Sequence, residues 1–148
     1  MKTLKDLLHE LNSLNKGIGD VLNAANFRSY DDLSSLQINY QSPEDLFLLD
    51  ELVEIMGKLE DINNSLTYLS KPIAGTYTLH KNRLGRYECA AHEYTSGNAI
   101  ECLVYDSYHD APSWVYTRIE HDGNDYYLVG YKEIPLEGLT VHIRGVKE

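Results

Sequence analysis

Apolar residues in the first 70 positions recur at alternating steps of three and four, the spacing typical of helices that pack through heptads. The later of two such sets starts after Ser42, whose side chain can cap free helix amides, and Pro43, which suits a first helical turn. The pattern therefore predicts a helix over residues 43–70. Its seam consists of Leu48, Leu52, Ile55, Leu59, Ile62, Leu66 and Leu69.

An earlier seam has the same length and consists of Leu4, Leu7, Leu11, Leu14, Ile18, Val21 and Ala25. The segment between the seams is long enough to turn the chain and hold a short helix at 30–36, so we expect an antiparallel helical hairpin. Gly17 and Gly19 interrupt the earlier seam, and each costs about 1 kcal/mol relative to alanine inside a helix, so we expect a break or kink there.

A second apolar stripe on the helix expected over 43–70 consists of Leu46, Leu49, Val53 and Met56. This half of the helix should be covered on two sides. The cover is residues 30–36, the C-terminal half of the chain, or a second copy of the chain.

The pattern changes near Lys71 and Pro72, after which apolar residues alternate in short runs separated by Gly, Asn and Asp. We therefore divide the chain into a helical domain, 1–71, and an all-β domain, 72–148. Strands are expected near 75–80, 84–91, 99–105, 113–121, 125–131 and 139–144. The predicted fold class is α+β, with the strands forming a small antiparallel β-barrel, SH3-like or similar, because closure removes exposed strand edges.

The register of the second expected hairpin follows from its turn at Thr95 and Ser96. That turn places Cys89 opposite Cys102, and their neighbours Tyr87 and Ala91 opposite Val104 and Ile100, all on one face of the sheet.

Composition and charge narrow the classes of function. The 148 residues include 13 Lys and Arg against 23 Asp and Glu, a formal net charge of −10. This charge argues against direct binding to nucleic acid or to an anionic membrane and favours a basic partner. No apolar run is long enough to span a bilayer, and two cysteines are too few for a secreted disulfide framework, so we expect a cytoplasmic protein.

The second half resembles a family of uncharacterised Firmicutes proteins associated with plasmids and conjugative elements. The resemblance covers about residues 75–145. It is carried by Gly75-Thr76-Tyr77, Gly85-Arg86-Tyr87-Glu88, Thr95-Ser96-Gly97-Asn98, Trp114, Arg118-Ile119-Glu120-His121, Tyr126-Tyr127-Leu128-Val129-Gly130 and Gly138-Leu139. The family has no assigned activity, so the resemblance implies a genomic setting. Mobile elements of this kind often carry small acidic inhibitors of host defence, including anti-CRISPR proteins.

The sequence offers little catalytic chemistry, and we expect no enzymatic activity and no cofactor. It has no phosphate-binding glycine loop, and its six histidines form no recognisable metal motif. Cys89 and Cys102 read best as buried apolar residues. A zinc or ligand site centred on them, with His92 as the nearest further ligand, is an alternative that lacks the usual ligand spacing.

Two groups of residues are candidates for partner binding. Alternation places Trp114, Tyr116 and Arg118 on one face of their expected strand, and these residue types are frequent interface anchors. The helix over 43–70 carries seven acidic residues against Lys58 alone, and its candidate partner-binding carboxylates are Asp50, Glu51, Glu54 and Asp61. Of these, Asp50, Glu54 and Asp61 lie within about 40° on the helix, away from the seam.

These observations predict a non-enzymatic interaction protein that binds a basic surface of a nucleic-acid-handling protein, as an anti-CRISPR-like inhibitor would. A Cas-type effector is one partner of this class. The alternatives are a structural adaptor that forms a homodimer or larger oligomer through the helical half, and the zinc or ligand-binding β-barrel.

Overall fold

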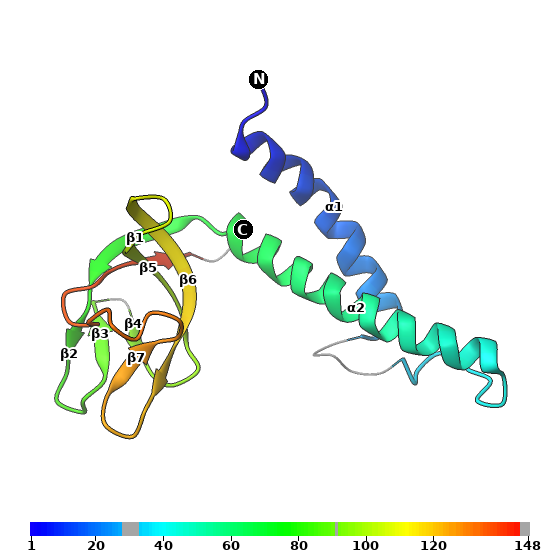
Figure 1. The fold of residues 1–148 in the computed structure, drawn as a ribbon. Helices are drawn as coiled ribbons and strands as arrows, with labels where there is room; N and C mark the ends of the chain where they lie inside the picture. The colour runs from blue at the N-terminus through cyan, green and yellow to red at the C-terminus, as the bar shows by residue number, and fades with distance from the viewer. Residues whose placement is uncertain (28–32, 91, 146–148) are drawn as a thin grey trace. The chain divides into compact units, whose positions relative to one another are not determined.

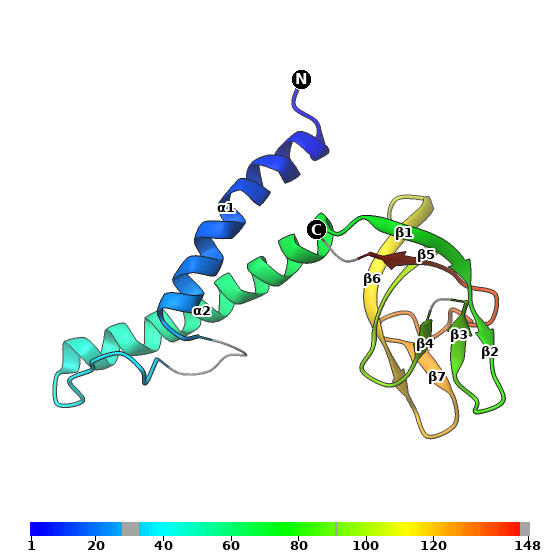
Figure 2. The same cartoon turned by 180° about the vertical axis from the view of Figure 1, so that it is seen from behind.

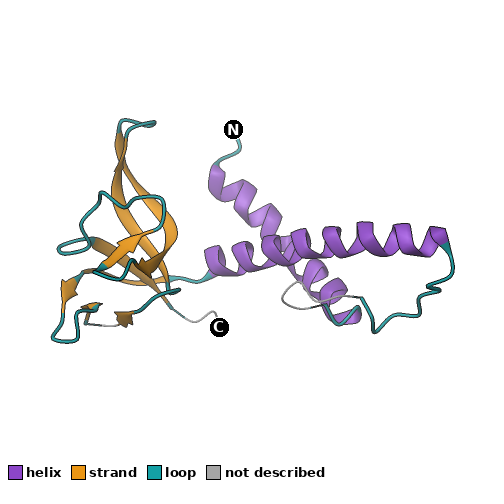
Figure 3. Ribbon diagram, turned by 60° about the horizontal axis from the view of Figure 1, so that its bottom comes forward, coloured by secondary structure: helices purple, strands orange, loops and turns teal. Residues whose placement is uncertain are grey.

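The structure, a computed structural model, describes residues 1–27, 33–90 and 92–145. The chain forms two compact units, Met1–Lys71 and Pro72–Glu148, and each is described by itself. Figure 1 and, from behind, Figure 2 show the order of the elements. In the described residues the helices belong to the first unit and the strands to the second, as Figure 3 shows, so the predicted α+β class is confirmed.

Helix α1 (Leu4–Ala24) begins at a capping box. The Thr3 hydroxyl accepts a hydrogen bond from the Asp6 backbone N–H at 3.1 Å, and the Asp6 carboxylate accepts one from the Thr3 N–H at 2.8 Å. Hydrogen bonding from the Thr3 backbone N–H, and next from its side chain, lowers the pKa of Asp6 because it favours the charged carboxylate. The expected break at Gly17 and Gly19 is absent, since both residues lie within the continuous helix.

Helix α2 (Pro43–Ser70) has the bounds that the sequence predicts. Ser42 is its N-cap and accepts a hydrogen bond from the Asp45 N–H at 3.2 Å, with Pro43 in the first turn. Glu44 and Asp45 add negative charge where the helix dipole is positive. Of the short helix expected at 30–36, residues 30–32 lie outside the described residues, and residues 33–36 form a turn instead.

The two helices are antiparallel, because Asn15 contacts Asn63 and Thr67 late in α2, whereas Leu22, nearer the end of α1, packs with Met56, which comes earlier in α2. The Asn63 amide donates to Asn15 Oδ1 at 2.7 Å, and the Asn15 amide donates to the Thr67 hydroxyl at 3.2 Å. Their core contains Leu22, Phe27, Leu33 and Met56, with Ile18, Ala25, Leu49, Val53 and Leu59 packed around it.

The heptad seams do not form the contact between α1 and α2 that the sequence led us to expect. Ile18, Ala25, Leu59 and Leu66 are at least partly buried, but most seam residues are exposed. The second stripe of α2, represented by Val53 and Met56, packs in the core instead, since Phe27 and Leu33 from the connecting segment cover it.

The second unit contains eight strands in the described residues. They are β1 (Ile73–Thr78), β2 (His80–Lys81), β3 (Tyr87–Cys89), β4 (His92–Tyr94), β5 (Ala99–Asp106), β6 (Ala111–His121), β7 (Tyr126–Leu128) and β8 (Thr140–Arg144). They form a five-stranded antiparallel sheet in the order β1-β8-β5-β6-β7 and a three-stranded antiparallel sheet in the order β2-β3-β4. In the described part of the unit these pairings do not join into a ring, so the expected closed barrel is not confirmed.

Both sheets contribute to one hydrophobic core. Its buried members are Leu79, Tyr87, Tyr94, Ile100, Cys102, Val104, Ile119, Leu128, Leu136, Leu139 and Val141. Turn residues set where strands end. Gly123 (φ +95°) lies in the β6–β7 turn at Asp122-Gly123-Asn124, and Gly138 (φ +81°) lies just before β8.

The register predicted for the second hairpin is wrong. The expected strand over 84–91 is a short β3 that pairs with β4, so that Cys89 lies opposite His92 and Tyr87 opposite Tyr94. Cys102 on β5 instead pairs with Val115 of β6 and Val141 of β8.

Candidate interaction site on the outer face of the five-stranded sheet

Strand alternation gives the middle of the five-stranded sheet one buried and one outward face. On β5, Ile100, Cys102 and Val104 are buried in the core, so Glu101 and Leu103 point to the opposite face. On β6, Ile119 and partly buried Val115 face the core, and the alternate residues Trp114, Tyr116 and Arg118 are exposed. On β8, Val141 and Ile143 face the core, which leaves His142 and Arg144 on the outer face.

The strand register assembles these outward residues around Glu101. Glu101 lies directly opposite Tyr116 of β6 on one side and His142 of β8 on the other. Trp114 lies two residue pairs further along, opposite Leu103 and on the same face. Residues separated by more than 40 positions in the chain therefore meet in one row across three strands.

Glu101 is a buried carboxylate held by two basic side chains. Its exposure is 7% although it lies on the outer face of the sheet. Arg144 donates to both carboxylate oxygens, from Nε at 3.0 Å and from Nη2 at 3.2 Å, and His142 Nδ1 lies 2.5 Å from Oε2. A two-pronged Arg–carboxylate pair fixes orientation as well as charge, so this cluster is a rigid support for what lies over it.

The side chain over the cluster is Trp114. Its indole stacks on the His142 ring, with centroids 3.3 Å apart and an angle of 14° between the planes. The stack reaches from β6 to β8 across β5. Trp114 nevertheless remains 38% exposed, and Tyr116 beside it is 55% exposed. The arrangement presents two aromatic side chains to solvent, one of which is held in place by a neighbouring ring.

Sequence reasoning predicted part of this site. It placed Trp114, Tyr116 and Arg118 on one face of a strand, and they do lie on one face of β6, where Arg118 also pairs with Glu120 at 3.3 Å. It did not identify Glu101, His142 or Arg144. The available signal was alternation, because Glu101 interrupts an apolar run and His142 and Arg144 flank Ile143.

The other predicted partner-binding residues belong to the first unit. Asp50, Glu51, Glu54 and Asp61 are exposed on α2. Glu54 forms an ion pair with Lys58, one turn along the helix, at 3.3 Å, and both side chains are well exposed. Exposed pairs of this kind are weak, so Glu54 retains most of its capacity to meet another cation.

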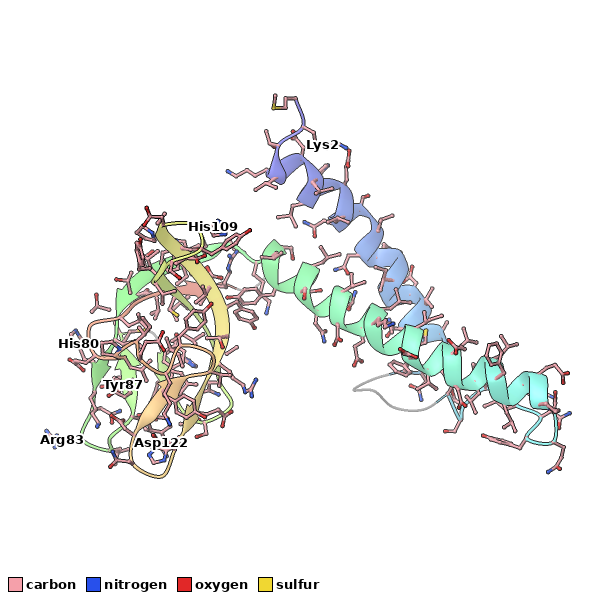
Figure 4. All side chains as sticks on the ribbon, in the orientation of Figure 1. Lys2, His80, Arg83, Tyr87, His109 and Asp122 are labelled. Atoms are coloured by element: carbon pink, nitrogen blue, oxygen red, sulfur yellow. The ribbon has the colours of Figure 1, made fainter. Side chains whose placement is uncertain are left out.

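The β unit also has acidic side chains beside a cavity, and these bind to other groups of the same unit. A cavity of about 420 Å³ is lined by residues that include Tyr87, Asp122 and Asp125, the first two of which are labelled in Figure 4. The Tyr87 hydroxyl donates to Asp125 Oδ2 at 3.1 Å, and Lys81 Nζ lies 3.3 Å from the same atom. Lys132 lies 3.6 Å from Asp122.

These contacts oppose further cation binding in the cavity. Burial raises the pKa of Asp125, but hydrogen bonds from Tyr126 N–H, Tyr87 and Lys81 lower it by more, so the net shift is downward. Backbone N–H groups of Asp125 and Asn124 lower the pKa of Asp122. Both carboxylates are therefore stabilised as anions by the unit's own donors and lysines.

The two cysteines do not face each other across a hairpin but border the same core. Cys102 is fully buried, and Cys89 is half-buried. Burial, assisted by the negative charge of Glu101, raises the pKa of the Cys102 thiol to about 11. In the part of the chain that the structure describes, no group of three or more His, Cys, Asp or Glu residues has an arrangement suited to a metal ion.

The fold and this site define an α+β protein whose β unit carries an aromatic outer face supported by a buried ion cluster. Residues 77–143 match the model of a family described as Domain of unknown function (DUF5348). The match runs from within β1 to within β8, so it includes Glu101, Trp114 and His142 but neither Arg144 nor the helices. No curated protein and no solved structure matches the chain.

The match shows an uncharacterised domain family in the second unit, the region in which the sequence showed its resemblance. A separate structural finding concerns membranes. No helix within the described residues combines the length and the apolar character that crossing a bilayer requires.

Proposed function

We propose that the protein is a non-enzymatic interaction protein that binds a basic surface of a nucleic-acid-handling protein. The observation that carries the proposal is the exposed pair Trp114 and Tyr116, of which Trp114 is stacked on His142 of the Glu101–His142–Arg144 cluster. Binding hot spots are rich in Trp, Tyr and Arg whose side chains are ordered before the partner arrives.

The charge of the chain supports a basic partner. The formal net charge is −10, and α2 contributes seven acidic residues against Lys58 alone. Exposed carboxylates at Asp50, Glu51 and Glu54 attract a positively charged surface and increase the rate of encounter. Proteins that handle nucleic acid present such surfaces because they must bind phosphate.

An anti-defence role on a mobile element, with a Cas-type effector as partner, is the narrower form of the proposal. Its support is the resemblance of the second unit to mobile-element proteins and the acidity that such a protein would use to compete with nucleic acid. Closure of this unit into the β-barrel that we expected is a separate proposal. It would require hydrogen bonds between edge strands, in addition to the strand pairs within the two sheets.

The proposal is tested by affinity capture from a host lysate with the full chain and two variants. One variant carries Asp50→Lys, Glu54→Lys and Asp61→Lys, and the other carries Trp114→Ala and Tyr116→Ala. We expect the natural chain to capture basic nucleic-acid-binding proteins that are lost from both variants. Captured proteins should also be released as salt is raised, since charge pairs at the surface are screened.

The matched controls are Asn64→Lys, an exposed change on α2 outside the acidic group, and Tyr108→Ala, an exposed aromatic in the β5–β6 connection. These two variants should capture the same proteins as the natural chain. Capture that is identical for all five proteins would overturn the proposal, because neither surface would then contribute to recognition.

A further inference from the structure

The helical unit leaves one row of its heptads exposed along both helices. In the usual heptad letters a to g, the seam residues spaced by seven at position d are Leu7, Leu14 and Val21 of α1 and Leu48, Ile55, Ile62 and Leu69 of α2; we call these the d row. All of them are apolar, and their exposures lie between 44% and 60%. Single exposed leucines are common on protein surfaces and need no explanation. A complete row of exposed apolar residues at one heptad position instead indicates an interaction surface.

The d row is exposed because α1 and α2 contact each other through another heptad position. Position e is occupied by Asn15 and Leu22 on α1 and by Met56 and Asn63 on α2. Leu22 and Met56 are buried in the shared core, and the Asn63 amide donates to Asn15 at 2.7 Å. Position d lies about 100° around the helix from position e.

The two parts of the d row lie on the same side of the helix pair. Both helices use position e for their contact, and they run antiparallel, so an equal rotation from e to d turns both helices toward one side. From Leu48 to Leu69 the row extends about 32 Å, and from Leu7 to Val21 about 21 Å. With helices about 10 Å wide, the row defines a face of roughly 500 Å².

We propose that this face is the interface of a symmetric dimer, in which α2 of one copy packs antiparallel to α2 of a second copy with the two-fold axis near Ile55. Helices with heptad spacing pack well against other helices with the same spacing. In a symmetric dimer both copies use the same surface, so the d row of one copy would pack on the d row of the other. A biological interface buries at least about 1,000 Å² in total, which two faces of about 500 Å² reach together.

The charges beside the d row favour a second copy in this orientation. Position g, next to d, holds Glu51 and Lys58, the only basic residue of α2. In an antiparallel pair centred between residues 54 and 55, Glu51 of each copy lies across from the partner's Lys58, which gives two opposite-charge pairs. In a parallel pair, g would face e, where α2 has Leu49 and Met56 and where α1 already packs.

Association through the d row would use Glu51 but would leave the f and c positions of α2, occupied by Asp50 and Glu54, outside the interface. The dimer is therefore compatible with the proposed binding of a basic protein but does not depend on it. Light scattering and sedimentation of the purified full chain, without any partner, test the dimer separately.

The first test compares Ile55→Glu with the natural chain by sedimentation equilibrium. We expect a dimer for the natural chain and a monomer with unchanged helix content for Ile55→Glu, because a carboxylate at the axis would face its own copy. The matched control is Leu84→Glu, which changes an exposed apolar residue of the other unit and should leave the dimer intact. A natural chain that remains monomeric when concentrated, or an Ile55→Glu chain that still dimerises, overturns the proposal.

The second test is a charge swap that distinguishes this orientation from other ways of pairing the same face. Glu51→Lys and Lys58→Glu should each raise the dimer dissociation constant on the order of tenfold, because each places like charges across the axis. The double variant restores two opposite-charge pairs and should return the constant to near its original value. If the double variant dimerises as weakly as the single variants, the antiparallel pairing at Ile55 is wrong.

Discussion

The Trp114 indole lies flat on the His142 ring, with ring centroids 3.3 Å apart, and the edge of the same ring is held by Glu101, whose Oε2 lies 2.5 Å from Nδ1. This chain of contacts connects an exposed aromatic to a buried carboxylate through one imidazole. It links the stability of the sheet to the surface that we propose for binding, because a change at either end disturbs the other.

Trp114→Ala removes the ring that lies over the cluster. We expect the free energy of unfolding of the β unit to fall by about 1 to 2 kcal/mol, because aromatic stacking and part of the buried surface are lost. Urea unfolding followed by circular dichroism measures the change, since Trp114 is the only tryptophan and its fluorescence is lost with it. Tyr108→Ala, at a residue 90% exposed, should change the stability little.

Glu101→Ala removes the carboxylate that joins His142 and Arg144. Because both basic side chains are largely buried, we expect a loss of about 3 kcal/mol, as when one partner of a buried ion pair is removed. The control is Arg118→Ala, which breaks the more exposed pair with Glu120 and should cost well below 1 kcal/mol. Equal losses in the two variants would show that the cluster is not the support of this face.

The parts of the fold that local chemistry determines were predictable from the sequence. Helix α2 begins at Pro43 because Ser42 caps it and proline suits the first turn. The β6–β7 turn follows from Asp122-Gly123-Asn124, where glycine permits a positive φ. Each of these signals lies within a few residues of the feature that it determines.

The parts that depend on distant contacts were not predictable in the same way. The sequence between Cys89 and His92 is Ala-Ala and contains no glycine, proline or asparagine, so the pattern joined two strands into one and misplaced the register of Cys89. The Glu101–Arg144 pair joins residues 43 positions apart. Heptad spacing identified the apolar positions of both helices, but the contact between α1 and α2 uses the neighbouring positions of Leu22 and Met56 and leaves most seam residues exposed.

The buried thiol of Cys102 should make stability depend on alkaline pH. Burial, with the charge of Glu101, raises its pKa from 9.0 to about 11, so the unfolded chain ionises at a lower pH than the folded protein. The contribution is complete below pH 9 and is lost as pH rises toward 11. Burial also raises the pKa of Tyr94 to about 12, which acts in the same direction at higher pH.

Urea midpoints measured across this pH range for the natural chain and for Cys102→Ala check the effect. The variant should lose less stability between pH 9 and pH 11 than the natural chain does. Thiol labelling provides a second measurement, in which half-buried Cys89 reacts before Cys102 in the folded protein. Rapid labelling of Cys102 without denaturant would contradict its assignment to the core.

Two glycine substitutions should change stability in opposite directions. Gly17 lies in the interior of α1 with open space around its α-carbon, so Gly17→Ala should stabilise the helical unit by about 1 kcal/mol. Gly138 also has open space but a φ of +81°, so Gly138→Ala should destabilise the β unit by about 1 kcal/mol through backbone strain alone. Thermal unfolding of both variants measures the two signs.

A comparison of Met56→Ala with Ile62→Ala separates the core of the helical unit from its exposed row. Met56 is 6% exposed and packs with Leu22, so its truncation should cost about 2 to 5 kcal/mol at any protein concentration. Ile62 is 46% exposed, so its truncation should cost less than about 1 kcal/mol in dilute protein. If two copies pair through the d row, the cost at Ile62 rises as the protein is concentrated, because dimerisation then adds to the stability that the variant loses. Unfolding at several concentrations gives both quantities, and a cost at Ile62 that stays constant would mean that this row meets no second copy.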